Sequence, residues 1–249
     1  MDNPQTHRQR PSSLENALNV LDLFTIDDPE FKIYEIAESL GVANSTAHRL
    51  VTTLMSEGFI SKDRQTNSYR LGASILALGH AIQSRIKLLD KANPILQKLV
   101  EVSQETAHIG ILIQQDVVYL SKIECSHPVR LLSYIGKRNP AECTSSGQVL
   151  LAYQPRDFLE PILQKVWNPS SFLLRLEEIK KQGFSVSVEE LHEGVVSISA
   201  PIKNHLGKVI ACVTVAGPKQ RLSPIAIPRV TRLVVQAAKE ISDQVKMMT

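Results

Sequence analysis

Polar side chains with a regular spacing occur between Asn44 and Glu57. The apolar residues of this stretch recur at i, i+3, i+4 and i+7, which is typical of one helix face; they are Ala47, Leu50, Val51 and Leu54. The side chains that must then point outward are Ser45, Thr46, His48, Arg49, Thr52 and Thr53. Small hydroxyls permit close approach, threonine methyls can contact thymine methyls, and arginine can bind guanine or phosphate. This helix face has the chemistry needed to read a DNA groove.

Three basic residues follow this helix, namely Lys62, Arg64 and Arg70. Strand-like residues 59–62 and 68–71 flank the polar segment 63–67, a pattern that predicts a β-hairpin. Basic side chains near a hairpin tip suit contacts with phosphates or with a minor groove. Periodicity alone leaves a second interpretation open, in which the same residues form an ordinary solvated helix and hairpin.

Charge is distributed unevenly over this part of the chain. Residues 12–42 contain seven acids and one base, Lys32, whereas residues 43–70 contain four bases and two acids. The net charge of +3 is too small to indicate nucleic-acid binding by itself. A basic stripe beside an acidic back could orient a protein on DNA, although such differences are also common on solvated faces.

The elements that must position these side chains follow from local patterns. Residues 14–26 and 34–40 have helical apolar spacing, and Gly41 can adopt the left-handed conformation that ends a helix. We expect Asn44 or Ser45 to cap the next helix, and Gly58 to terminate it. A helix, a short helix, a tight turn, a second helix and a hairpin form the order of a winged helix-turn-helix, whose second helix enters the major groove.

The remainder predicts an α+β protein with an antiparallel sheet and packed helices. Helices are expected at 73–89, 90–105, 146–153, 157–166, 172–182 and 224–248, and strands at 107–113, 117–123, 129–135, 195–201 and 209–215. The predicted division is a flexible tail at 1–12, a winged helix-turn-helix at 13–72, a linker helix at 73–89 and a second domain at 90–249. The linker helix is apolar on more than one side, so we expect it to be buried, at a dimer contact.

Composition excludes several classes of protein. The 249 residues contain no apolar run of the roughly 20 residues needed to cross a bilayer. Residues 1–13 lack the apolar segment of a secretory signal, so we expect a cytoplasmic protein with no membrane partner. The three cysteines, Cys125, Cys143 and Cys212, are odd in number and far apart, which favours reduced thiols over a disulfide framework.

Residues that could bind a metal ion are present but lack the usual ligand spacing. Cys125, His127, Cys143, His108 and His192 form neither a C-x-x-C nor an H-x-x-x-H pattern. The chain also lacks the G-x-S-x-G turn of many hydrolases and the glycine patterns that bind nucleotides. We therefore predict no metal and no cofactor.

Several longer motifs resemble the IclR family of bacterial regulators. In the first half they are VANSTAHRLVTTLMSEGFI at 42–60 and SYRLG at 68–72. In the second half they are CTSSGQVLLA at 143–152, QGFS at 182–185 with Glu190, GVVSISAP at 194–201, and GKVIACVTVAGP at 207–218. The resemblance extends from about Ser12 to Gln244, with the motifs in the family's order.

This resemblance implies a winged helix, a linker helix and an effector domain related to GAF and profilin-like folds. It also implies homodimers, often paired into tetramers, on palindromic DNA operators. The effector of such a protein is typically a small organic acid, held by backbone N–H groups where a helix begins, here at Ser145, Ser146 and Gly147. Further pocket positions transfer to Ser197 and Thr214, with Ala216 where the family often has a hydroxyl.

Two features of these motifs leave alternatives open. Near Ser187 and Val188, where some family members carry an acid, this sequence has none, which leaves the identity of the ligand undecided. Without the family context, Ser145, Ser146 and Gly147 could equally be a simple helix cap and turn.

Three functions are therefore compared. The favoured one is a sequence-specific DNA-binding regulator, more often a repressor, whose operator affinity is controlled by a small carboxylate. An enzyme using a pocket around Ser146, Ser197 and Thr214 is the alternative, weakened by the lack of a visible nucleophile and base pair. An adaptor whose winged helix binds protein is the third, and the outward Arg49 and the bases of the hairpin favour DNA over it.

Overall fold

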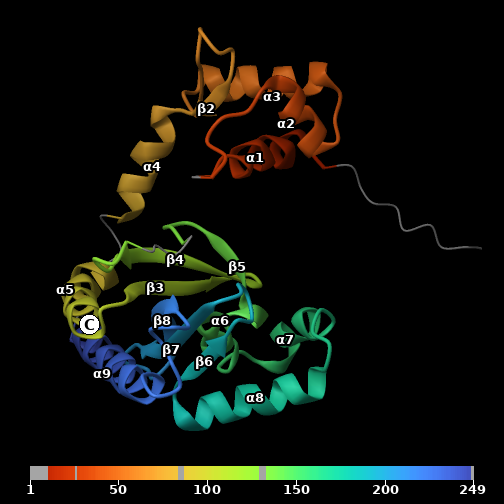
Figure 1. The fold of residues 1–249 in the computed structure, drawn as a ribbon. Coiled ribbons are helices and arrows are strands. Elements are labelled where there is room, and N and C mark those ends of the chain that lie inside the picture. Colours follow the sequence, from red (N-terminus) through yellow and green to blue (C-terminus); the bar gives the residue numbers. More distant parts are fainter. Residues whose placement is uncertain (1–10, 26, 84–86, 129–132, 248–249) are drawn as a thin grey trace, which may run out of the picture. The chain divides into compact units, whose positions relative to one another are not determined.

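A computed structural model describes residues 11–25, 27–83, 87–128 and 133–247 of the chain. Contacts between residues divide it into two units, Met1–Arg85 and Ile86–Thr249 (Figure 1). The predicted tail at 1–12 falls mostly outside the described residues. None of the helices in the described segments is both long and apolar enough to span a membrane.

The first unit begins, in its described part, with three helices and a two-stranded hairpin, which precede α4 (Ala73–Gln83). These are α1 (Ser13–Leu23), α2 (Ile33–Leu40), α3 (Asn44–Ser56), β1 (Ile60–Lys62) and β2 (Tyr69–Leu71). Its core is formed by the inward residues of all three helices and of the hairpin, among them Val20, Ile36, Leu50 and Ile60. Gly41 ends α2 at φ 64°, a left-handed conformation that glycine adopts at no steric cost. The winged helix-turn-helix predicted from the sequence is present.

Two helix starts differ from the prediction. The N-cap of α3 is Ala43, which has no capping side chain, so neither Asn44 nor Ser45 caps the helix. At α1, Ser12 belongs to the helix cap: its hydroxyl accepts a hydrogen bond from the Glu15 N–H at 3.1 Å, while the Glu15 carboxylate accepts from the Ser12 N–H at 2.6 Å. This reciprocal pair satisfies two of the free donors of a helix start.

The helical segment that follows the hairpin differs in extent from the predicted linker. The structure contains α4 (Ala73–Gln83) and α5 (Lys87–Ser103), with residues 84–86 outside the described part. The second helix thus begins three residues before the predicted domain boundary at 90. Leu76 and Leu78 on α4 are 76% and 54% exposed, so the apolar surface expected to be buried is uncovered in a single chain.

The second unit is built on one six-stranded antiparallel sheet with the strand order β5-β4-β3-β8-β7-β6 (Figure 1). The strands are β3 (Thr106–Ile113), β4 (Asp116–Ile123), β5 (Arg138–Pro140), β6 (Ser185–Val188), β7 (Val195–Lys203) and β8 (Val209–Pro218). Of the predicted strand at 129–135, residues 129–132 lie outside the described part and 133–135 are not strand. The short strands β5 and β6 were not predicted, because three or four residues give too little alternation to detect.

The central strands place different chemistry on the two faces of the sheet. Side chains alternate along a strand, and the apolar residues of β7 and β8, such as Ile198 and Val213, belong to one core. Their neighbours Ser197, Ser199 and Thr214 point to the opposite face. The register pairs Ser199 with Thr214 and Thr214 with His108. Strand pairing thus produces a row of polar side chains on a single face.

Helices cover both faces of this sheet (Figure 1). α5 and α9 (Ile227–Lys246) pack on the apolar face in one core. On the other face, a second core includes α6 (Ser145–Leu151), α7 (Arg156–Leu163) and α8 (Pro169–Gln182). A 3-10 turn, η1 (Ala141–Cys143), leads from β5 into α6. The polar row therefore lies on the face that carries α6.

Candidate nucleic-acid interface and ligand pocket

The outward face of α3 has the composition expected from its sequence. Ala47, Leu50 and Val51 are buried in the core of the first unit. The remaining side chains of the predicted set, Ser45, His48, Arg49, Thr52 and Thr53, are exposed, and Thr46 is half-buried. All six lie within nine consecutive residues of one helix, so helical geometry alone brings them onto one surface.

The two threonines near the end of this face have fixed orientations. The Thr52 hydroxyl donates to the His48 carbonyl oxygen at 2.8 Å, and the Thr53 hydroxyl donates to the Arg49 carbonyl oxygen at 3.1 Å. Such bonds to the preceding turn use the hydroxyl proton within the helix. Each threonine can then offer a hydroxyl lone pair and a methyl group to a ligand, but not its hydroxyl proton.

The tip of the hairpin is shaped by its own side chains. The Asp63 carboxylate accepts hydrogen bonds from the backbone N–H groups of Gln65 and Thr66 at 2.8 and 3.0 Å. These bonds hold the pKa of Asp63 below its ordinary value. Lys62 lies 5.3 Å above the ring of Tyr69, while Arg64 and Arg70 are exposed. The three cations therefore lie along the hairpin, Lys62 on β1, Arg64 in the turn and Arg70 on β2.

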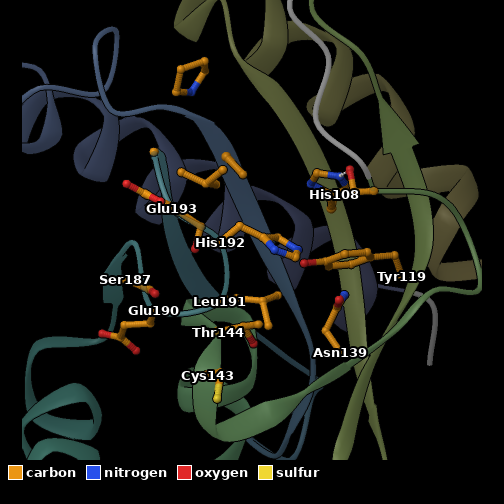
Figure 2. Close-up of a pocket in the computed structure, with 16 residues that line it drawn as sticks. His108, Tyr119, Asn139, Cys143, Thr144, Ser187, Glu190, Leu191, His192 and Glu193 are labelled. Atoms are coloured by element: carbon orange, nitrogen blue, oxygen red, sulfur yellow. Dashed lines mark hydrogen bonds between the residues drawn. The ribbon is translucent and has the colours of Figure 1, made fainter.

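The second unit contains a pocket of about 420 Å³ on the polar face of its sheet. This volume lies within the range of small-molecule sites. Figure 2 shows side chains from β3, β4, the turn before α6 and the segment that joins β6 to β7 converging on it. Hydroxyl, amide, imidazole and carboxyl groups line the pocket together with a few apolar groups; the polar members include Ser133, Asn139, Thr144, Ser187, Ser197 and His192.

Only two of the six residues predicted to contact an effector line this pocket, namely Ser197 and Ala216. The other four, Ser145, Ser146, Gly147 and Thr214, are buried behind it. The N–H of Gly147 already donates to the Thr144 hydroxyl at 3.0 Å, which makes Thr144 the cap of α6. The simple helix cap considered for this motif is therefore part of its role.

Three of these buried residues, Ser145, Ser146 and Thr214, belong to a continuous network of hydroxyl groups. Ser145 bonds Ser197 at 2.8 Å and Ser199 at 2.7 Å. Ser146 bonds Thr214 at 2.9 Å, and Thr214 bonds Ser199 at 2.7 Å. Buried hydroxyls that are fully bonded fix the position of the elements that carry them. This network joins α6 to β7 and β8, and Ser197 is the member that lines the pocket.

Two aromatic side chains form one wall of the pocket. The imidazole of His108 stacks on the ring of Tyr119 with centroids 4.5 Å apart, and its Nε2 lies 2.9 Å from the Ser133 hydroxyl. Burial, assisted by the positive charge of Lys122, lowers the pKa of His108 to about 3, so this imidazole is neutral. Its Nδ1 is buried without a partner among the residues described. Burial also raises the pKa of Tyr119 to about 12, opposed by a hydrogen bond with Ser146.

Acidic side chains reach the pocket despite the absence of an acid at positions 187 and 188. Glu190 and Glu193 both line it. They come from the segment after β6, because the chain turns there and brings these later residues back over the pocket. Glu190 is 2.6 Å from an Arg175 nitrogen and accepts a hydrogen bond from Gln148 at 2.6 Å, so its charge is compensated.

Several lining residues had been considered only as metal ligands or had received no role. His108, Cys143 and His192 belonged to the first group, and Tyr119 to the second. The described residues contain no group of three or more side chains suited to a metal ion. Strand alternation is the signal that could have found His108 and Tyr119. Each lies on the face of the sheet opposite to the apolar residues that flank it in the sequence, such as Ile109 and Leu120.

Two thiols of the second unit, those of Cys143 and Cys212, are less acidic than usual. Burial raises the pKa of Cys212 to about 12, and burial with the charges of Glu142 and Glu190 raises that of Cys143. A nucleophile needs a lowered pKa or an adjacent base. The arrangement suits binding of a small molecule better than covalent chemistry.

Comparison with known proteins agrees with this assignment. Residues 13–64 match the family model described as the IclR helix-turn-helix domain, and residues 80–243 match the C-terminal domain of the bacterial transcriptional regulator IclR. The chain is 32% identical to the HTH-type transcriptional regulator BhcR of Paracoccus denitrificans, over 92% of this chain and 86% of that protein. It is 26% identical to the transcriptional repressor IclR of Escherichia coli, over 92% and 88% of the two chains.

A solved structure has the same fold. It is an IclR homologue from Microbacterium hydrocarbonoxydans in complex with 4-hydroxybenzoate, with a TM-score of 0.82, 23% identity, and coverage of 95% of this chain and 100% of that one. The family models together account for most of the chain, and the relatives are regulators rather than enzymes. The chain therefore belongs to the IclR family of bacterial transcriptional regulators.

Proposed function

We propose that this regulator is a cytoplasmic repressor that binds a palindromic operator through α3 and the hairpin, and that a small organic acid in the pocket controls its affinity for DNA. The observation that carries this proposal is the pairing of an exposed polar helix face in one unit with a polar pocket of about 420 Å³ in the other. A ligand that prefers one state of the protein changes DNA affinity by the same factor as DNA changes ligand affinity.

The groups around the pocket support an acid as the effector. Ser197, Ser187 and Asn139 can donate hydrogen bonds to a carboxylate. Glu190, which would repel an anion, is paired with Arg175. The ligand of the related solved structure, 4-hydroxybenzoate, is itself a carboxylate. We place Ser197 and Ala216 in contact with the effector, and Ser145, Ser146, Gly147 and Thr214 in support behind them.

Calorimetry tests this assignment. The probes are acetate, butyrate, succinate, adipate and 4-hydroxybenzoate, titrated into the wild type and into Ala216→Leu, whose larger side chain would occupy the pocket. At least one probe should bind the wild type. Its affinity for the variant should be lower by about tenfold or more, because the leucine side chain occupies space that the ligand needs. An exposed substitution on α8, Leu174→Ser, serves as the control. Absence of binding by all five probes would refute the acid effector.

Binding to DNA is tested separately. A fluorescence anisotropy titration with the DNA upstream of its own gene should show saturable binding, and addition of the bound acid should shift the midpoint. Binding that is equal for unrelated DNA of the same length would contradict a specific operator.

We also propose a homodimer, with pairs of dimers forming tetramers. A palindromic site needs two recognition helices related by a twofold axis. The exposed Leu76 and Leu78 of α4 supply an apolar surface for that contact. Light scattering should give at least twice the 27.7 kDa of one chain. The double substitution Leu76→Ser and Leu78→Ser should reduce the mass to that of a monomer, whereas Leu174→Ser should leave it unchanged; a wild-type monomer at micromolar concentration would contradict the proposal.

A further inference from the structure

One short segment supplies a large share of the pocket lining. The β6–β7 loop, Glu189–Gly194, connects the last two strands at one edge of the sheet. Every residue of this loop except Glu189 lines the pocket. None of its six residues is buried, so it has little apolar contact to hold it in place. Segments with few buried contacts are the ones that open at low free-energy cost.

The β6–β7 loop is closed instead by the side chain of Glu189. One carboxylate oxygen of Glu189 accepts a hydrogen bond from the Gly194 N–H at 2.9 Å, and the other is paired with the Lys219 ammonium. The N–H of Lys219 in turn donates to the Gly194 carbonyl oxygen at 2.8 Å. Glu189 therefore ties both ends of the loop to the end of β8. Its φ of 59° is a left-handed conformation that costs energy for a residue with a side chain.

A second ionic contact connects the same loop to the helices. Glu190 bonds Arg175 of α8 and Gln148 of α6, each at 2.6 Å. Gln148 is buried and also accepts a hydrogen bond from the Ser185 hydroxyl at 2.9 Å. Exposed ion pairs contribute little free energy individually. Both contacts can therefore be broken at a low free-energy cost.

The position of the loop shows what its closure does. In Figure 2, His192 extends from the loop across the pocket toward Tyr119, while His108 and Tyr119 form the opposite wall. A molecule in the pocket would lie between the loop and this aromatic wall. The loop therefore forms one wall of the pocket, and Glu189 holds both ends of that wall.

From this geometry, and resting on the pocket being the effector site, we propose that the β6–β7 loop is the gate of the effector pocket and that Glu189 is the positioning residue that holds the gate closed. The loop controls how fast a small molecule enters and leaves. Glu189 does not contact that molecule; it acts through the loop.

The alkylation rates of two free cysteines test this gate in the absence of an effector. Cys143 lines the pocket, whereas Cys212 is fully buried in the core beneath it. Cys143 is only partly buried, so alkylation by iodoacetamide, followed at each cysteine by peptide mass spectrometry, compares how accessible its thiol is in each variant. Glu189→Ala removes both contacts and should accelerate alkylation of Cys143 by about tenfold. Lys219→Gln removes the ion pair alone and should accelerate it by about threefold.

Matched controls separate gating from loss of structure. Glu178→Ala removes an exposed acid of α8 and should leave the alkylation rate unchanged. Cys212 should remain unreactive in every variant, because it reacts only when the whole unit opens. Glu189 is not among the groups that raise the pKa of Cys143, but Glu190 of the same loop is, so alkylation is measured over a range of pH and compared as the rate constant of the thiolate. An unchanged Cys143 rate in Glu189→Ala overturns the proposal, as does a parallel rise at Cys212.

Kinetics with a bound carboxylate distinguish this inference from the proposed function. For any of the five probes that binds the wild type, stopped-flow should show that Glu189→Ala raises the association and dissociation rate constants together, each by about tenfold, with a smaller change in Kd. A change in the dissociation rate constant alone, with a matching change in Kd, would make Glu189 an ordinary binding residue and overturn the gate. If none of the probes binds, the acid effector fails, while the cysteine result still decides the gate.

Discussion

The two units place their functional side chains by different means. In the first unit, Ser45 to Thr53 lie on one turn after another of a single exposed helix, and their positions follow from helical periodicity. In the second, the pocket is assembled from residues as distant as His108, Glu190 and Ala216. A groove-reading surface can thus be built locally, because DNA provides the complementary shape. A small molecule must be surrounded, and that requires several strands and loops to converge.

Substitutions that disrupt the packing of only one unit test most directly whether the two units are independent. A Cβ atom at Gly147 would lie 2.1 Å from the Ala141 carbonyl oxygen, and one at Gly72 would lie 2.1 Å from the Gly58 carbonyl oxygen. We expect Gly147→Ala to destabilise the second unit by about 3 kcal/mol, and Gly72→Ala to do the same to the first. Hydrogen exchange of peptides from each unit measures this. Equal loss of protection in both units would show that they do not fold independently.

We expect Arg49 of the first unit to contribute to DNA binding but not to effector binding by the second unit. Arg49→Ala should weaken operator binding by about 1–3 kcal/mol, because it removes a base or phosphate contact, and should leave effector affinity unchanged. Anisotropy at fixed salt measures the change, with the exposed Arg232→Ala of α9 as the control. Unaltered operator affinity would remove Arg49 from the interface. A loss that is uniform across DNA sequences would assign it to phosphate.

The buried imidazole should make the stability of the second unit depend on pH. The pKa of His108 is about 3 when folded and near 6.5 when unfolded, so the unfolded chain binds more protons between these values. Stability should therefore rise with pH in this window. Between pH 6.5 and pH 5 the loss from His108 amounts to about 2 kcal/mol.

Urea unfolding of the wild type and of His108→Gln at pH 7, 6 and 5 measures this dependence. Glutamine can keep a hydrogen bond to Ser133 without the titrating ring. The variant should lose less stability on acidification, whereas the exposed His48→Gln of the first unit should behave as the wild type. Identical slopes for the wild type and His108→Gln would contradict a neutral buried imidazole.

The smallest expected effect concerns the hairpin tip. Lys62→Ala should weaken binding to all DNA sequences alike, by less than about 1 kcal/mol, and should lower the salt dependence of binding by about one unit of slope. Anisotropy over a range of salt concentrations provides the measurement, with Lys208→Ala in the second unit as the control. A selective loss for one sequence would show that Lys62 reads bases.

Local sequence patterns predicted the structure correctly where the candidate functional residues lie on a single helix. The order of elements in the first unit and the outward residues of α3 follow from apolar spacing and from Gly41. The cap of α3 was wrong because a capping side chain is a preference that tertiary packing can override. In the second unit, the main strands 107–113, 117–123, 195–201 and 209–215 agree with β3, β4, β7 and β8.

The pocket is the part that local signals did not define. The motif at Ser145–Gly147 identifies a helix start, but the register of β7 and β8 turns its hydroxyls into buried bonds with Ser199 and Thr214. The loop after β6 returns Glu190 and His192 over the cavity, although they follow positions where an acid was judged absent.

By itself, then, the sequence determined the family, the winged helix and the outward side chains of its second helix, because helix periodicity acts over a few residues. Only the tertiary structure decided which side chains line the pocket. Strand order and register bring together residues about a hundred positions apart, and no local pattern encodes such distances. The same long-range pairing made His108 neutral, since its pKa depends on burial by strands that lie far from it in the chain.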